Sequence, residues 1–185
     1  MSGRDSDILL LHVCCAPCAS ACVERLLAEG RKIRLFFSNS NLCSEAEYSR
    51  RRESVRRLAS LTRTELVEDP YDHASWHAAV SASLPGYRAY PEGTERCRFC
   101  FSFSLGQAAE HARQNGMSFT TSLTVSPHKN SKLIFEVGSR WSFFEAVDFK
   151  KKDGFQRSIE LSKQYGFYRQ DFCGCEFSQK QRDAS

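Results

Sequence analysis

The chain has 185 residues, of which 41% are hydrophobic and 26% charged, a composition typical of one soluble domain with its own core. Its net charge of +4 permits an anionic partner without identifying one. No run of about 18 apolar residues exists to span a membrane. The polar N-terminus, with Asp5 and Asp7, does not resemble a signal peptide. We therefore expect a cytoplasmic protein with a single domain over 1–185 and frayed ends at 1–7 and 179–185.

The first third of the chain alternates apolar runs with helix-like segments. A continuous apolar run at 8–13 predicts a buried parallel strand. Pro17 marks a helix start, which predicts a helix over 18–29 that ends at Gly30. A second strand is expected at 33–37. Ser44 and Glu47 form a capping box, which predicts a long helix over 45–62 before a third strand at 65–67.

The same alternation continues to the C-terminus. A helix is expected over 74–82, followed by a connection rich in Pro, Gly and Tyr, and a long helix over 96–115. Strands at 119–125 and 143–149 then alternate with helices over 130–139 and 155–165. The pattern predicts an α/β fold: one Rossmann-like domain of three layers, with a mostly parallel sheet flanked by helices. The functional site should lie at the carboxyl ends of the strands.

Nine cysteines stand out in this ordinary composition. Disulfides suit small secreted domains, and an odd number of cysteines cannot pair completely, so the thiols indicate metal or redox chemistry. Seven fall into three groups: Cys14, Cys15 and Cys18 after the first strand, Cys97 and Cys100 at a helix start, and Cys173 and Cys175 around Gly174. The other two, Cys22 and Cys43, are expected to be a core residue and a loop residue rather than ligands.

The local geometry of each group suits metal binding. We expect helix N-termini to lower the pKa of Cys18, Cys97 and Cys100, and the spacing of Cys97 and Cys100 places both on one helix face. A structural zinc ion or a 4Fe-4S cluster needs four protein ligands, so seven leave a surplus for a second metal or for redox thiols. A structural zinc site, a thioredoxin-like dithiol and a purely structural role for the cysteines remain alternatives.

Five motifs resemble the QueH-type epoxyqueuosine reductases, and the resemblance extends from Ile8 to Ser178. The motifs are His-Val-Cys-Cys-Ala-Pro-Cys at 12–18, Arg-Cys-Arg-Phe-Cys-Phe at 96–101, Thr-Thr-Ser-Leu-Thr-Val-Ser-Pro-His-Lys-Asn at 120–130, Asp-Phe-Lys-Lys-Lys-Asp-Gly-Phe-Gln-Arg-Ser at 148–158, and the segment 165–178 that contains Cys-Gly-Cys.

The resemblance implies a specific activity. The epoxide of epoxyqueuosine, at the wobble position of tRNA, would be reduced to queuosine in the final step of queuosine biosynthesis, without cobalamin. The deoxygenation consumes two electrons and two protons, and the electron donor is not identified. The resemblance also implies a 4Fe-4S cluster and a second, mononuclear iron, which zinc could replace in aerobic preparations. A non-catalytic zinc-binding RNA-interaction module and a thiol–disulfide oxidoreductase are the alternatives.

Site residues follow from the same motifs. We expect metal ligands among Cys14, Cys15, Cys18, Cys97, Cys100, Cys173 and Cys175, of which Cys18 is the most replaceable; Cys97, Cys100 and one or both of Cys173 and Cys175 are the first choices for the cluster. Candidate proton donors and catalytic residues are His12, His128, Asp148 and Tyr168. Basic residues expected to contact RNA phosphates are Arg50, Arg51, Arg52, Lys129, Lys150, Lys151, Arg157 and Arg169.

Overall fold

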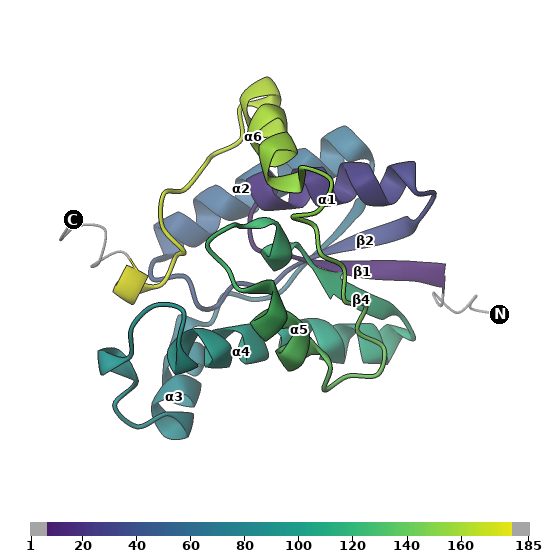
Figure 1. Ribbon diagram of the computed structural model, residues 1–185. Coiled ribbons are helices and arrows are strands. Elements are labelled where there is room, and N and C mark those ends of the chain that lie inside the picture. Colours follow the sequence, from purple (N-terminus) through teal and green to yellow (C-terminus); the bar gives the residue numbers. More distant parts are fainter. Residues whose placement is uncertain (1–6, 179–185) are drawn as a thin grey trace.

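The computed structural model contains a four-stranded sheet in which every strand pair is parallel (Figure 1). The strands are β1 (Ile8–Val13), β2 (Lys32–Phe37), β3 (Glu65–Glu68) and β4 (Ser118–Thr121), in the order β3-β2-β1-β4. The structure describes residues 7–178. The ends expected to fray, 1–7 and 179–185, therefore lie outside the described residues except for Asp7. Because β1 has neighbours on both sides, its carboxyl end lies in the middle of the sheet edge.

Helices cover both faces of this sheet (Figure 1). On one face lie α1 (Ala16–Ala28), α2 (Glu45–Thr62) and α6 (Gly154–Tyr165); on the other lie α4 (Glu95–Asn115) and α5 (Ser131–Gly138). Successive side chains of β1 point to opposite faces of the sheet and so contribute to both helical layers. Leu9 and Leu11 pack toward α1, while Leu10 packs toward α4. The predicted three-layer α/β fold is therefore confirmed. None of the described helices is long and apolar enough to cross a bilayer.

Local capping explains where the helices of the first layer begin. The hydroxyl of Ser44 accepts a hydrogen bond from the backbone N–H of Glu47, as the predicted capping box requires. Helix α1 begins at Ala16, two residues earlier than expected, with Pro17 in its first turn and Cys15 as the N-cap. The first cysteine group therefore spans the junction between β1 and α1.

Helix α3 (His73–Ser83) and the short 3₁₀ helix Tyr87–Ala89 form a small lobe beside the start of α4 (Figure 1). Trp76 and Tyr87 pack there with Phe177 in a separate apolar cluster. This lobe brings the C-terminal segment close to the first turns of α4.

The predicted strand over 119–125 is too long. After β4 the chain turns into a 3₁₀ helix, Ser122–Val125, because the Thr121 hydroxyl accepts the N–H of Leu123 and turns the backbone out of the sheet.

The predicted strand over 143–149 is wrong. Only Phe144 makes an isolated bridge to Phe119, and the rings of both pack together. Beyond that bridge, Thr124 donates to the carbonyl of Val147 and accepts from the N–H of Phe149. A side chain thus fixes this segment where a strand ladder was expected.

Candidate metal centre

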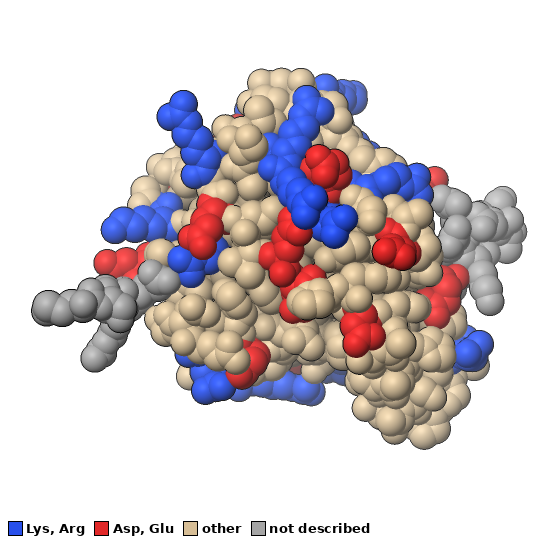
Figure 2. Space-filling model, turned by 180° about the vertical axis from the view of Figure 1, so that it is seen from behind, with Lys and Arg blue, Asp and Glu red and all other residues tan. Residues whose placement is uncertain are grey.

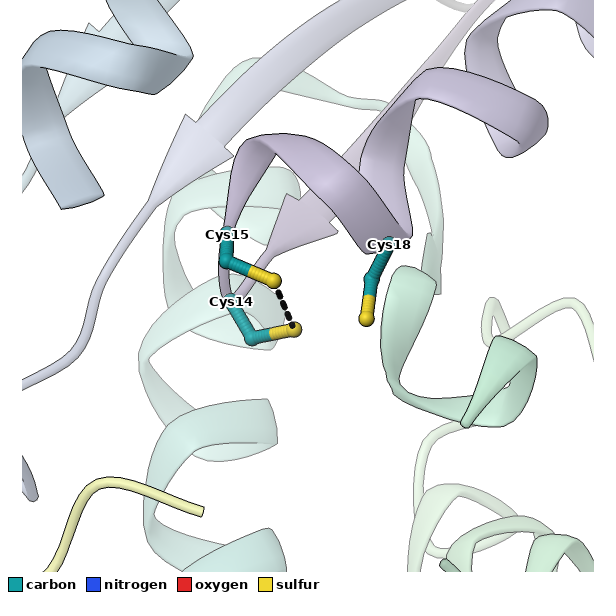
Figure 3. Close-up of side chains that lie close together, drawn as sticks. All are labelled: Cys14, Cys15 and Cys18. Atoms are coloured by element: carbon teal, nitrogen blue, oxygen red, sulfur yellow. Dashed lines mark hydrogen bonds between the residues drawn. The ribbon is translucent and has the colours of Figure 1, made fainter. Parts of the chain in front are cut away.

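The first cysteine group, Cys14, Cys15 and Cys18, lies where β1 ends and α1 begins (Figure 3). Cys14 directly follows the last residue of β1, Cys15 is the N-cap of α1, and Cys18 lies in the first turn of that helix. Their three sulfur atoms lie within 4.8 Å of one another, and those of Cys14 and Cys15 are 3.7 Å apart. Three soft donors that converge in this way could hold a metal ion. We refer to them as the N-terminal trio.

The remaining four of the seven grouped cysteines come from two distant segments and line a common cavity. Cys97 and Cys100 lie on the first turns of α4, and Cys173 and Cys175 belong to the C-terminal segment. All four line one small cavity of about 50 Å³. We refer to them as the distal four. The structure therefore divides the seven grouped cysteines into a set of three and a set of four.

The expected effect of helix N-termini on these thiols is wrong. Burial raises the pKa of Cys97 and raises that of Cys100 well above its usual value, with Cys173 and Cys175 adding to both shifts. The pKa of Cys18 is also raised, because it shares hydrogen bonds with the other two thiols of the trio. In these places burial and neighbouring sulfur atoms outweigh the helix dipole.

Cys15 differs from the other thiols of the site. Hydrogen bonds with Cys14 and Cys18 hold its pKa well below the usual value, and the positive charge of Arg51 acts in the same direction. The side-chain amide of Gln170 also donates a hydrogen bond to its sulfur, at 3.1 Å. Sequence reasoning missed Gln170, although it lies in one of the matching motifs, three residues before Cys173.

The C-terminal segment is held over the site by hydrogen bonds with distant parts of the chain. The N–H of Cys43 donates to the carbonyl of Gly174 at 2.8 Å, and Arg51 donates to the carbonyl of Cys173 at 3.0 Å. Gly174 has φ +128°, and a Cβ atom there would lie 2.3 Å from Leu42 Cδ2. Glycine is therefore required between the two cysteines, as the Cys-Gly-Cys motif suggests.

A larger cavity of about 530 Å³ opens beside both sets of cysteines. Cys18 and Cys173 contribute to its wall, together with His128, Lys129 and Arg169. The cavity has the size of a small-molecule site. The chain thus places potential metal ligands in the wall of a space that could receive a substrate.

Lys129 lines both cavities and therefore lies between the two sets of cysteines. Burial alone would lower the pKa of its ammonium group, but Cys173 and the N-terminal trio raise it strongly. Among the described residues, no carboxylate lies within ion-pair distance of it. Lys129 is thus a fixed positive charge that faces sulfur atoms.

His12, a candidate proton donor, is buried and held on both sides. Its Nε2 lies 3.1 Å from the carbonyl of Ser38 and its Nδ1 lies 3.0 Å from the hydroxyl of Thr121. Because a carbonyl only accepts, Nε2 carries the proton and Nδ1 accepts from the hydroxyl. Burial lowers the pKa of His12, which keeps the ring neutral. These contacts give His12 a structural position behind the trio.

The other three candidate donors lie in different surroundings. His128 is exposed and lines both cavities. Tyr168 donates its hydroxyl to buried Glu47 at 2.9 Å. Asp148 accepts the backbone N–H of Lys150 in a turn between α5 and α6. Of the four, His128 is thus the one that the structure places in the walls of both cavities.

Three of the arginines expected to contact RNA are engaged by carboxylates, and one of them, Arg50, pairs with Glu47 while it stays exposed. Arg51 is only 2% exposed and donates to Glu47 at 2.7 Å, so its guanidinium is not at the surface. Arg157 makes two hydrogen bonds with Glu24, at 2.8 and 2.9 Å, and one with Glu160. Arg51 is therefore not available to a phosphate, whereas the ion pairs of Arg157 lie at the surface.

The remaining basic residues have mixed surroundings. Lys150 donates to the carbonyl of Lys129 and to Ser131, and so fixes the loop that carries Lys129. The guanidinium of Arg52 lies over the ring of Tyr48. The exposed residues of the set are Arg50, Lys151 and Arg169. Figure 2, the view opposite to Figure 1, shows basic side chains beside acidic ones over most of that face.

Comparison with known proteins gives consistent matches. Residues 9–181 match the family model described as Epoxyqueuosine reductase QueH. The chain is 35% identical to the Epoxyqueuosine reductase QueH of Streptococcus pyogenes serotype M1, with 93% of this chain and 70% of that protein aligned. It is 35% identical to that of Thermotoga maritima, over 94% and 91% of the two chains, and 34% identical to that of Acinetobacter baylyi, over 94% and 81%.

Proposed function

The chain belongs to the epoxyqueuosine reductase QueH family, and from that membership we propose that it reduces epoxyqueuosine in tRNA to queuosine. In this reaction both carbon–oxygen bonds of the epoxide break and a carbon–carbon double bond forms. The oxygen leaves as water, so two electrons and two protons are consumed, and cobalamin is not required. The observation that carries the proposal is a substrate-sized cavity with cysteine sulfurs in its wall.

The donor set fits an iron–sulfur centre. All nine cysteines are free, which suits the reducing cytoplasm where we propose that the protein works. The distal four would hold a 4Fe-4S cluster and the N-terminal trio would hold a second iron. When bound, these groups supply electrons one at a time and a Lewis acid for the epoxide oxygen. The buried N–H of Arg51 Nη2, which has no acceptor within residues 7–178, also fits an anionic sulfur nearby.

The residues around the larger cavity would bind and orient the modified nucleoside. An unpaired wobble base can be splayed out of the anticodon loop and inserted into such a space. Lys129 would face the departing oxygen, stabilise its negative charge and hold a proton for it. Phe155 and Phe172 line the same cavity and would exclude water around the base. Lys150, through the carbonyl of Lys129, would keep this loop in place.

The exposed basic residues Arg50, Lys151 and Arg169 would contact the phosphates of the tRNA. Arg169 already lines the cavity, so it is the nearest of them to the proposed substrate. Contacts of this kind release counterions, and the affinity for tRNA should therefore fall as the salt concentration rises.

Anaerobic reconstitution tests the proposal directly. The protein is loaded with iron and sulfide, and turnover of tRNA that contains epoxyqueuosine is followed with a chemical reductant in place of the cellular electron donor. We expect a brown protein that forms queuosine. Cys97→Ala should lose iron and activity, while Cys22→Ala, at a core cysteine outside both sets, should keep them. A colourless protein that binds only zinc would support the zinc-binding RNA module instead.

A further inference from the structure

Arg51 occupies an unusual position for an arginine within a run of three. It lies on the buried side of α2, and its guanidinium is in contact with three different partners. Nε donates to Glu47 at 2.7 Å, Nη1 donates to the carbonyl of Cys173 at 3.0 Å, and the ring of Phe172 lies 5.6 Å below. The side chain therefore joins α2 to the Cys-Gly-Cys segment.

The segment is built around this guanidinium. A Cβ atom at Gly174 would lie 3.0 Å from Nη2 and 3.1 Å from Nη1 of Arg51, so the glycine backbone rests directly on it. The same positive charge acts on Cys15 of the N-terminal trio. Arg51 thus contacts the Cys-Gly-Cys segment and acts on the trio, and it does not line the larger cavity.

One nitrogen of this buried group has no acceptor. Nη2 has no hydrogen-bond partner among residues 7–178, whereas Nε donates to Glu47 and Nη1 donates to the carbonyl of Cys173. Glu47 is itself occupied, since it also accepts from Tyr168 and pairs with Arg50. A buried, charged N–H without an acceptor is costly, and this one lies beside Gly174, on a guanidinium whose charge also acts on the thiol of Cys15. The missing acceptor therefore has the chemistry of an anionic sulfur.

We propose that Arg51 is a positioning residue of the metal centre, which fixes the Cys-Gly-Cys segment through Nη1 and donates from Nη2 to an anionic sulfur of the bound group. The inference rests on the proposed function for the nature of that group. It assigns Arg51 to the interior of the site and away from the RNA surface. Hydrogen bonds to the sulfurs of such a centre stabilise its reduced form, so Arg51 would raise the reduction potential.

The first arm of the test needs no metal. Hydrogen exchange in the apoprotein is compared for Arg51→Gln, Arg51→Lys and Arg57→Gln, the last an exposed arginine on the same helix. We expect the amides of Cys43 and Gly174 to exchange at least about tenfold faster in Arg51→Gln than in the wild type, with no change in Arg57→Gln. Unchanged exchange in Arg51→Gln would overturn the positioning role, even if the protein proved to have a different function.

The second arm uses the reconstituted protein and a potentiometric titration followed by electron paramagnetic resonance. At the wild-type midpoint we expect the ratio of oxidised to reduced centre to rise about tenfold in Arg51→Gln, which is about 59 mV toward negative potential for one electron. The reduction potential of Arg51→Lys, which keeps the positive charge, should shift less than that of Arg51→Gln. The lysine variant provides the measurement if the glutamine variant fails to fold. If both Arg51 variants were fully loaded with iron and sulfide and had the same reduction potential as the wild type, the proposal would be overturned. A wild type without any reducible centre would instead refute the proposed function.

Discussion

The side-chain amide of Gln170 donates a hydrogen bond to the sulfur of Cys15, 3.1 Å away and 155 positions earlier in the chain. Outer hydrogen bonds of this kind orient a metal ligand, and their loss costs about 10–100-fold in metal affinity. We therefore expect Gln170→Leu to weaken metal binding by about that factor, measured by competition with a chelator under anaerobic conditions. Gln164→Leu, at an exposed position on α6, is the control. Equal affinities of the two variants would contradict this role of Gln170.

Lys129 and Lys151 should respond differently to the loss of their charge. Lys129 lines both cavities, whereas Lys151 is exposed. Lys129→Met should lower kcat about 10²-fold, because a positioned charge in a buried site stabilises developing negative charge. Lys151→Met should instead lower tRNA affinity and reduce the salt slope by about 1. Single-turnover assays and salt titrations separate the two effects; a mainly tRNA-binding defect in Lys129→Met would show that it contacts phosphate.

Gly174→Ala should destabilise the protein and release its metal. The substitution combines φ +128° with a contact of 2.3 Å to Leu42, which we expect to cost about 3 kcal/mol. Gly86→Ala is the matched control, because φ is +72° there but nothing lies within 4 Å of the added carbon, so the cost is about 1 kcal/mol. Chemical denaturation measures the unfolding free energy of the two variants, and metal analysis measures their metal content. Equal losses of stability and of metal in both variants would rule out a packing role for Gly174.

Glu145 should make a pH-dependent contribution to stability. Burial raises the pKa of its carboxyl group, but hydrogen bonds from Arg31 and Ser118 outweigh this and lower it. A carboxylate with a lowered folded-state pKa stabilises the protein above its unfolded pKa, and the contribution is lost as the pH falls through the folded value. Both partners are about one third exposed, so Glu145→Gln should cost at most about 1 kcal/mol at pH 7.

Urea denaturation of wild type and Glu145→Gln at neutral and acid pH provides the measurement. The difference in unfolding free energy should shrink toward zero below about pH 4. Glu53→Gln, at a highly exposed position, should show little difference at either pH. A difference for Glu145→Gln that stays constant with pH would mean that its charge contributes nothing.

Local signals predicted most of the fold. The apolar run of β1 and the capping pair Ser44 and Glu47 act within a few residues, so the sequence alone locates them. The segment 143–149 has the composition of a strand, yet it is fixed by Phe119 and Thr124, which lie more than 20 positions earlier. Such contacts depend on the tertiary structure and leave no periodic signal.

The site shows the same division between local and tertiary information. The spacing of the cysteines identified all three groups, but their separation into a trio and a distal four depends on where the C-terminal segment docks. The arginine run at 50–52 predicts a surface that contacts RNA phosphates. A signal against that interpretation was present, because Arg51 recurs at helical spacing with buried Val55 and Leu58. Periodicity could therefore have separated Arg51 from its neighbours.

The docking of the C-terminal segment also has a kinetic consequence. Cys173 and Cys175 are separated from Cys97 and Cys100 by more than 70 residues, and contacts between segments so far apart in the sequence form slowly. The metal centre should therefore be assembled late, after the transition state for folding has been crossed. Interactions formed at that stage leave the folding rate nearly unchanged and slow unfolding instead. Bound metal should thus prolong the lifetime of the native protein far more than it accelerates its formation.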